Sequence, residues 1–317
     1  MKLKISALLF IFFVIGCKTE KKSTEIIELE KPQQYITVLG IAQDGGYPHI
    51  GCQKECCINY YNRTSKRKSV VSLGLVDLKN KQKWLFEATP NMHTQLADLE
   101  QNHLKNDKII DGVFLTHAHI GHYTGLMYFG REALGEKGTK VYAMPKMKSF
   151  LKKNGPWSQL VSLQNIALQK LQKDSTIVLN NNLKVTPFLV PHRDEFSETV
   201  GYKIEGTNKT ALFIPDIDKW YKWKKNIIEE VKKVDYAFLD ASFLKDGEIS
   251  RPMSEIPHPF TSETVALFKN ESLTTKNKVI FIHFNHTNPT LQENSKERKE
   301  IEKLGFRFAS EGNNYEL

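Results

Sequence analysis

The chain has 317 residues, of which 40% are hydrophobic and 26% are charged. This composition supplies enough apolar side chains for one large buried core and excludes a disordered or fibrous protein. The formal net charge is +9, but the lysines are scattered and no nucleic-acid motif accompanies them, so we expect no nucleic-acid partner. Two short basic clusters, residues 66–68 and 222–225, could meet anionic lipid or an acidic substrate.

Residues 1–16 have the pattern of a bacterial lipoprotein signal peptide. Lys2 and Lys4 precede an apolar run over residues 5–15, which is too short to span a bilayer comfortably as a helix. The run leads to Gly16 and Cys17, which resemble a lipobox, where the cysteine is lipidated and becomes the first residue. We therefore expect a flexible linker over residues 17–33 and a protein anchored to a bacterial membrane in the cell envelope, facing the periplasm or the cell surface. An ordinary cleaved signal peptide is the alternative.

Residues 34–317 are predicted to form one α/β domain. Strand-like runs occur at residues 35–39, 70–76, 84–86, 112–115, 183–190, 200–204, 211–214, 236–239 and 279–283. Helical patterns occur at residues 92–100, 146–152, 219–231, 263–268 and 291–304. The early strands follow one another through turns, whereas the later strands alternate with helices. We therefore expect two sheets packed face to face with helices outside.

Three cysteines, Cys52, Cys56 and Cys57, lie close together after the first predicted strand. Their number is odd, and the adjacent Cys56 and Cys57 are poorly placed to pair with each other, so a disulfide framework is not the natural interpretation. Thiolates at Cys52 and at Cys56 or Cys57, together with a distant histidine, would make a closed tetrahedral zinc site. One disulfide plus one free thiol is the alternative outside the reducing cytosol.

Three histidines, His117, His119 and His122, fall within six residues on the loop that leaves the predicted strand at 112–115. At a strand end they can converge on one ion, so their spacing predicts a metal site. Neutral imidazole suits zinc, iron, copper and nickel, whereas magnesium and calcium prefer oxygen ligands.

Histidine and aspartate also recur just after the later predicted strands. These positions are His192, Asp216, Asp240, His283 and His286. With the histidine triplet, they resemble the five ligand motifs of the metallo-β-lactamase superfamily, which follow one another in this order along an αββα sandwich. The resemblance covers nearly everything from residue 36 to residue 317 and implies that fold.

Within the superfamily, the chain is most similar to the branch around pyrroloquinoline quinone biosynthesis protein B. The stretches that carry this similarity are residues 39–48, 87–90, 191–195, 199–202 and 285–289. The front of the chain also resembles the cyclic phosphodiesterases of phosphonate breakdown, in which a glycine-rich turn runs into a cysteine-bearing zinc loop. That similarity supports a structural zinc at Cys52, Cys56 and Cys57, with His258 as the fourth ligand.

The superfamily resemblance implies a two-metal centre in which Asp216 bridges the ions. The other ligands would be His117, His119 and His192 for the first ion, and His122 and His283 for the second. We favour His283 over His286 as the late ligand because His283 directly ends its strand.

The chain departs from the superfamily pattern at Gly121. The superfamily usually has a carboxylate at this position, which ligates the second metal and helps orient the nucleophilic water, and glycine cannot supply it. The second site would therefore be weak, hold a different ion, or be completed by another residue such as Asp218 or Asp240.

The implied activity is hydrolysis of an ester, lactone, phosphodiester or amide in a small-molecule substrate, at one or two zinc ions. Three imidazoles with an open position make a catalytic zinc site, which lowers the pKa of a bound water to about 7. Asp216 would accept a proton from that water or hold its hydroxide in line, and Arg193 and Tyr123 would bind an anionic substrate or its developing charge. Two alternatives stay open: an iron-dependent oxidase or oxygenase, as the quinone branch implies, and a non-catalytic metal-binding lipoprotein.

Overall fold

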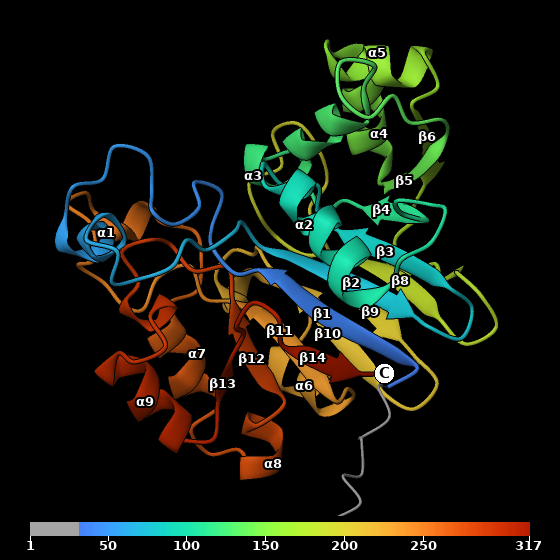
Figure 1. Cartoon of the computed structure of the whole chain (residues 1–317). Helices are drawn as coiled ribbons and strands as arrows, with labels where there is room; N and C mark the ends of the chain where they lie inside the picture. The colour runs from blue at the N-terminus through green and yellow to red at the C-terminus, as the bar shows by residue number, and fades with distance from the viewer. Residues whose placement is uncertain (1–31) are drawn as a thin grey trace, which may run out of the picture. The chain divides into compact units, whose positions relative to one another are not determined.

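Two seven-stranded β-sheets lie face to face in the part of the chain that the computed structural model describes, residues 32–317 (Figure 1). The predicted α/β sandwich is thereby confirmed. The predicted signal peptide, and the predicted linker up to residue 31, lie outside the described residues. Within residues 32–317, no helix combines the length and the apolar character needed to cross a membrane.

The first sheet has the order β14-β1-β2-β3-β4-β5-β6. Its strands are β14 (Asn314–Glu316), β1 (Gln34–Gly40), β2 (Ser72–Asp77), β3 (Gln82–Phe86), β4 (Gly112–Phe114), β5 (Thr139–Ala143) and β6 (Ile166–Lys170). Antiparallel pairing joins β14, β1, β2 and β3, and parallel pairing joins β3, β4, β5 and β6. The turn expected between the early strands is short between β2 and β3, whereas residues 41–71, with a short helix, separate β1 from β2.

The second sheet repeats this plan, with the order β13-β12-β11-β10-β9-β8-β7. Its strands are β13 (Arg307–Phe308), β12 (Val279–Ile282), β11 (Tyr236–Asp240), β10 (Thr210–Ile214), β9 (Val200–Glu205), β8 (Lys184–Leu189) and β7 (Ile177–Val178). Neighbouring strands from β7 through β10 pair antiparallel, and neighbouring strands from β10 through β13 pair parallel. Strands β8, β10, β11 and β12 therefore run in one direction and end at one edge of the sheet.

Aromatic rings from both sheets meet in the shared core. Phe86 of β3 stacks on Phe114 of β4 with ring centroids 4.9 Å apart. Across the interface, Phe86 lies edge-on to Tyr202 of β9 at 5.4 Å and to Phe213 of β10 at 6.2 Å. All four side chains are fully buried. These contacts hold the strand ends of the two sheets in a fixed relation.

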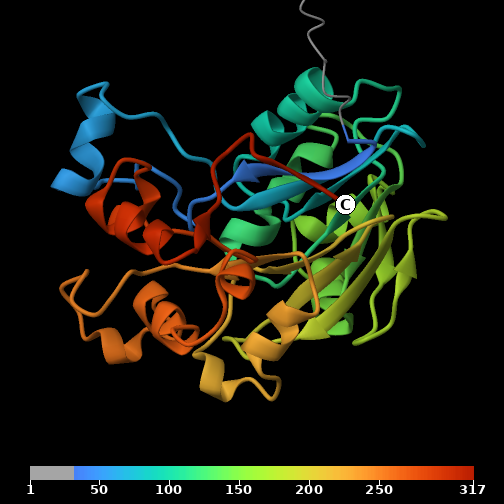
Figure 2. The same ribbon diagram turned by 90° about the horizontal axis from the view of Figure 1, so that it is seen from below.

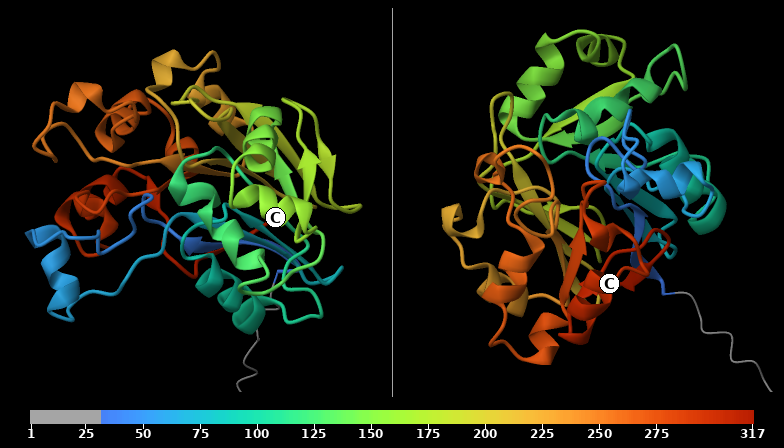
Figure 3. Two further views of the ribbon diagram at one scale, coloured as in Figure 1. Left: turned by 90° about the horizontal axis from the view of Figure 1, so that it is seen from above. Right: turned by 90° about the vertical axis from the view of Figure 1, so that its left-hand side faces the viewer.

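Helices cover the outer faces of the sheets (Figures 1 and 3). On the first sheet these are α2 (Met92–Asp98) with its π-helical continuation η1 (Leu99–His103), the 3₁₀ helix η2 (Thr124–Phe129), α4 (Pro145–Lys153) and α5 (Trp157–Ser162). On the second sheet they are α6 (Ile227–Lys232), α7 (Thr261–Leu267), α8 (Leu273–Lys276) and α9 (Lys296–Lys303). The short helices α1 (Glu55–Tyr61), α3 (Ile120–Tyr123), η3 (Trp220–Lys222), η4 (Met253–Glu255) and η5 (Pro289–Leu291) lie in loops.

The nine predicted strands all correspond to observed strands, but five further strands escaped prediction. Those five are β5, β6, β7, β13 and β14. Three of them have only two or three residues, too few for an alternating pattern to be visible. The other two, β5 and β6, lie between residues 127 and 174, a segment in which no strand was predicted.

Capping residues explain where two predicted helices differ from the observed ones. The predicted helix at 219–231 is broken, because the Asn226 side chain accepts hydrogen bonds from the backbone N–H groups of Ile228 and Glu229 and starts α6 there. Similarly, the Ser295 hydroxyl accepts a hydrogen bond from the backbone N–H of Arg298 and starts α9 later than predicted.

The contact between the sheets predicts a large effect of Phe213→Ala on stability. Removing this buried ring leaves a cavity between β10 and β3, and we expect the free energy of unfolding to fall by about 3–5 kcal/mol. Urea denaturation of the purified full-length protein measures this change. The control is Phe196→Ala, because Phe196 is 61% exposed and its loss leaves no core cavity. Equal stability of the two variants would contradict the proposed role of the aromatic core.

Candidate metal centre

Strand ends and one short helix bring the candidate ligands together. His117 and His119 follow β4, His122 lies in α3, His192 follows β8, Asp216 follows β10, Asp240 ends β11 and His283 follows β12. The carboxyl ends of such strands lie at one edge of an α/β sheet, where ligands commonly bind. The packed sheets thus gather residues that lie up to 166 positions apart in the chain.

The first donor group consists of His117, His119, His192 and Asp216. One ligand atom from each lies within 4.8 Å of the others. Asp216 Oδ2 lies 3.3 Å from His117 Nε2, and Asp216 Oδ1 lies 3.2 Å from His192 Nε2. Three imidazoles and a carboxylate are a ligand set that zinc accepts.

The second donor group joins Asp216 to Asp240, His258 and His283, all of them buried. His258 Nδ1 lies 3.1 Å from Asp216 Oδ1 and 2.7 Å from Asp240 Oδ2. His283 Nδ1 lies 3.7 Å from Asp240 Oδ1. Because Asp216 belongs to both groups, the two are continuous.

The third donor group consists of Asp44, His122 and His283. Asp44 Oδ1 lies 3.0 Å from His122 Nε2 and 3.7 Å from His283 Nε2. His122 Nε2 also lies 3.6 Å from Asp216 Oδ2. Since His283 is shared with the second group, the three groups form a single centre.

Several buried donor atoms in this centre have no hydrogen-bond partner among residues 32–317. They are His117 Nε2, His119 Nδ1, His122 Nδ1, His192 Nε2, His283 Nε2 and Asp216 Oδ1. Unpaired buried polar atoms are rare, because each one costs free energy. A metal ion would satisfy such a cluster, and imidazole with carboxylate suits zinc or iron. The residues therefore fit a metal centre.

The other ring nitrogens of these histidines are held by neighbouring polar groups. His117 Nδ1 lies 2.9 Å from Thr116 Oγ1, and His192 Nδ1 lies 3.2 Å from Asp218 Oδ1. His283 Nδ1 lies 2.9 Å from Ser242 Oγ. Such contacts orient a metal-ligating imidazole and set which nitrogen is free to bind. Asp218, which the sequence suggested as a replacement ligand, instead positions His192.

Charge favours a cation in this centre. Burial raises the pKa of Asp216, but His192, His258 and His283 outweigh this effect and hold it well below its usual range. Burial also raises the pKa of Asp240, and His258 and His283 lower it to about 2. Conversely, burial lowers the pKa of His283, whereas Asp216, Asp240 and Asp44 raise it to about 9. The carboxylates therefore stay ionised at neutral pH and attract a positive charge.

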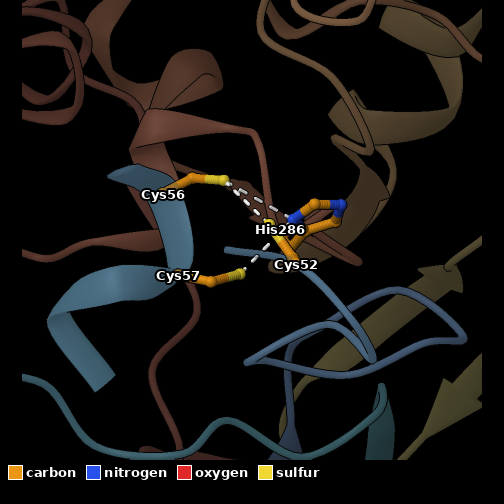
Figure 4. Close-up of side chains that lie close together, drawn as sticks. All are labelled: Cys52, Cys56, Cys57 and His286. Carbon is orange, nitrogen blue, oxygen red and sulfur yellow. Dashed lines mark hydrogen bonds between the residues drawn. The ribbon is translucent and has the colours of Figure 1, made fainter. Parts of the chain in front are cut away.

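A separate group of donors lies at Cys52, Cys56, Cys57 and His286 (Figure 4). The Cys56 and Cys57 sulfur atoms lie 3.6 and 3.5 Å from His286 Nδ1, and the Cys52 and Cys56 sulfur atoms lie 3.7 Å apart. All three cysteines are free. Three thiols and one imidazole around a common point make the donor set of a structural zinc site.

The cysteine site joins two distant parts of the chain. Helix α1, which carries Cys56 and Cys57, lies beside the segment that follows β12 (Figures 2 and 3). Burial lowers the pKa of His286 to about 4, with smaller contributions from His49 and Lys54, so the ring is neutral and able to bind a metal. The prediction that His258 completes this site was wrong, because the sandwich places His258 beside Asp216 and Asp240.

Comparison with known proteins agrees with this geometry. Residues 83–313 match the family model described as "Beta-lactamase superfamily domain". The chain belongs to this superfamily. The match spans β3 to the end of β13 and includes every donor of the histidine centre except Asp44. The predicted metallo-β-lactamase resemblance is thereby confirmed.

Relatives within the superfamily include the quinone-biosynthesis branch. The chain is 26% identical over 306 residues to coenzyme PQQ synthesis protein B of Gluconobacter oxydans, covering 89% of this chain and 98% of that protein. The zinc-bound PqqB structure from Methylobacterium extorquens has a TM-score of 0.73 at 22% identity, covering 89% and 100% of the two chains. A diphosphatase of the PhnP family has a TM-score of 0.63 at 22% identity, covering 90% and 97%. The predicted similarity to the PqqB branch is confirmed.

Two predicted substrate-binding residues have different surroundings. The Tyr123 ring is buried and lies edge-on to Phe150 at 5.3 Å and to Trp157 at 5.1 Å, so it packs in the core beside the first sheet. We therefore assign Tyr123 a packing role in place of the predicted contact with substrate. Arg193, by contrast, is exposed on the loop that carries His192.

Two residues at the histidine centre were not predicted from the sequence. Asp44 lies in a glycine-rich segment that reads as an ordinary turn. Glu87 is fully buried directly after β3, and its Oε1 atom lies 3.3 Å from His122 Nδ1. Glu87 occupies the same kind of position, just past a strand end, that marked the other acidic and histidine residues. The position of Glu87 directly after a predicted strand is therefore a sequence signal that could have identified it.

The cysteine site predicts that His286→Ala loses about one zinc ion per chain, because three thiolates leave a tetrahedral site incomplete. The midpoint of thermal unfolding should fall by several degrees, since the bound ion stabilises only the folded chain. Elemental analysis and calorimetry measure the two effects. The control is His49→Ala, because His49 stacks on His286 at 4.4 Å but is not a donor. Full zinc content in His286→Ala would exclude the site.

Proposed function

We propose that the protein is a metal-dependent hydrolase that cleaves an ester, lactone, phosphodiester or amide bond. The observation that carries this proposal is the set of unpaired nitrogens of His117, His119 and His192 beside the Asp216 carboxylate. A zinc ion held there supplies a Lewis acid and an acidified water. The PhnP-family diphosphatase among the structural neighbours supports a hydrolytic use of this fold.

Asp216 is the residue we assign to the chemistry. It is only 3% exposed, and its two oxygens face different histidines, Oδ1 facing His192 and Oδ2 facing His117. Because its pKa is held low, the carboxylate is ionised. An ionised carboxylate can orient a water beside these histidines or hold its hydroxide in line.

We assign substrate binding to the loop after β8. Arg193 is exposed next to His192, and Glu195 Oε2 lies 3.7 Å from His119 Nε2, so this loop borders the first donor group. An exposed guanidinium beside a metal site suits an anionic group on a small-molecule substrate, because it can bind a carboxylate or phosphate with two hydrogen bonds.

Iron-dependent oxidation is the second candidate. Asp44, His122 and His283 form a set of two histidines and one carboxylate, which is the ligand type of non-haem iron oxygenases. The relationship to coenzyme PQQ synthesis protein B supports this candidate. Metal identity separates it from the first: iron with oxygen consumption would favour oxidation, and zinc with hydrolysis would favour the hydrolase. Bound metal without either activity would indicate a binding protein.

We also propose that the protein acts in the cell envelope, held to a membrane by lipid on Cys17. The support is the sequence alone: Lys2 and Lys4, the apolar run at residues 5–15, and Gly16 before the cysteine. One acyl chain gives only marginal membrane binding, so stable anchoring requires more than one on this residue.

Asp216→Asn tests the hydrolase. This variant keeps the shape of the side chain but removes its charge, and we expect kcat/KM to fall by about 100-fold or more. The assay uses the zinc-loaded protein with bis(p-nitrophenyl) phosphate, p-nitrophenyl acetate and a simple lactone. Asp246→Asn is the control, because Asp246 is exposed and is not among the donors of the centre. An unchanged rate in Asp216→Asn would end its assignment to the chemistry.

Cys17→Ser tests the anchor. Cells that express the full-length protein and are fed an alkyne-labelled fatty acid should label the wild type but not Cys17→Ser, since a hydroxyl does not replace the lipidated thiol. Cys52→Ser should keep the label, because Cys52 lies in the cysteine site. Equal labelling of Cys17→Ser and the wild type would rule out lipid on Cys17.

A further inference from the structure

We propose that Asp44 supplies the carboxylate ligand of a second metal site, with His122 and His283, and that it occupies the space of the side chain that Gly121 lacks. The proposal rests on metal binding by the centre and not on the hydrolase chemistry. It assigns the missing carboxylate to a loop outside the histidine motif.

The three donors come from separate segments and converge. Asp44 lies on the loop after β1, His122 in α3, and His283 directly after β12. Asp44 Oδ1 lies 3.0 Å from His122 Nε2 and 3.7 Å from His283 Nε2. His283 Nε2 is buried and has no hydrogen-bond partner in the described part of the chain. One ion between these atoms would satisfy His283 Nε2 and would take the place of the hydrogen bond between Asp44 Oδ1 and His122 Nε2.

Asp44 fills the space beside Gly121 that a side chain at position 121 would need. A Cβ atom added at Gly121 would lie 2.4 Å from Asp44 Oδ1 and 2.7 Å from Asp44 Cα, closer than real atoms approach. Gly121 lies in helix α3 and is not among the glycines with positive φ. Its backbone conformation therefore does not require glycine, whereas the position of the Asp44 carboxylate does.

The backbone holds Asp44 against the strand end that carries His283. Gln43 N–H donates to Phe284 O at 2.8 Å, and Phe284 N–H donates to Ile41 O at 2.8 Å. These bonds tie the loop just before Asp44 to the residue just after His283. His283 itself has a φ of +67°, a conformation that non-glycine residues adopt only when the surroundings impose it. Both donors are therefore fixed before any ion binds.

The surroundings of His122 and Asp44 also suit a ligand pair. The buried Glu87 carboxylate lies 3.3 Å from His122 Nδ1, and the hydrogen bond of His122 is made by Nε2 to Asp44 Oδ1 at 3.0 Å. Burial raises the pKa of Asp44, but His122 and His283 hold it well below its usual range, which keeps the carboxylate in its ligating form. The Asp44 side chain is 26% exposed, which leaves access from solvent.

The first test is the metal content of the full-length protein. After loading with zinc and dialysis against a weak competing chelator, we expect Asp44→Ala to hold about one ion fewer than the wild type, or to bind that ion at least about tenfold more weakly. Asp44→Asn should behave in the same way while keeping the shape of the side chain, which covers the case that Asp44→Ala disturbs folding. Asp246→Ala, which removes an exposed carboxylate, should keep the full content.

The second test places a side chain at Gly121. Gly121→Ala should bind the second ion more weakly and should lower the midpoint of thermal unfolding, because its Cβ atom would lie 2.4 Å from Asp44 Oδ1 and 2.7 Å from Asp44 Cα. Gly135→Ala is the control for zinc affinity, because a Cβ atom added there meets nothing within 4 Å. Wild-type zinc affinity in Asp44→Ala and Asp44→Asn would overturn the proposal, as would wild-type zinc affinity in Gly121→Ala. These readouts do not need turnover, so a protein without hydrolase activity would leave this inference standing.

Discussion

The buried carboxylate of Asp216 is the interaction on which the histidine centre depends. Its two oxygens face His117 and His192, which follow strands of the two sheets, and His258, which lies on the connection between β11 and α7. Without a cation, a charge this deeply buried would be costly, and the surrounding imidazoles would repel one another once protonated. The sandwich therefore stabilises this arrangement only together with positive charge.

The aromatic contact between the sheets explains how the ligands stay in place. Phe86, Phe114, Tyr202 and Phe213 pack in the layer just beneath the strand ends. Ligands on loops are positioned only as well as the strands that precede them, and a close-packed core shifts little. Second contacts such as Thr116 to His117 and Ser242 to His283 then fix the ring orientations.

Sequence reasoning found the sandwich and most of the centre because both depend on local signals. His192, Asp216 and His283 each follow an apolar run, and the end of a buried strand can be read without knowing its partners. Asp44 could not be found in this way, since its role depends on a bare Cα at Gly121, 77 positions later, and only the folded chain shows that contact. The prediction of His258 as the fourth ligand of the cysteine site failed for the same reason. Only the packing of α1 against the segment after β12 brings His286 to the cysteines.

The cysteine site also acts on the chain as a long-range cross-link. Cys56 and His286 are 230 positions apart, so an ion bound between them would close almost the whole domain into a loop and restrict the unfolded chain as a disulfide would. The same two segments carry ligands of the other centre, since residues 44–57 include both Asp44 and the cysteines, and residues 283–286 include both late histidines. Removal of the ion from the cysteine site by a chelator would therefore loosen residues 44–57 and 283–286 together. The geometry of the histidine centre would then depend on an ion that is bound outside that centre.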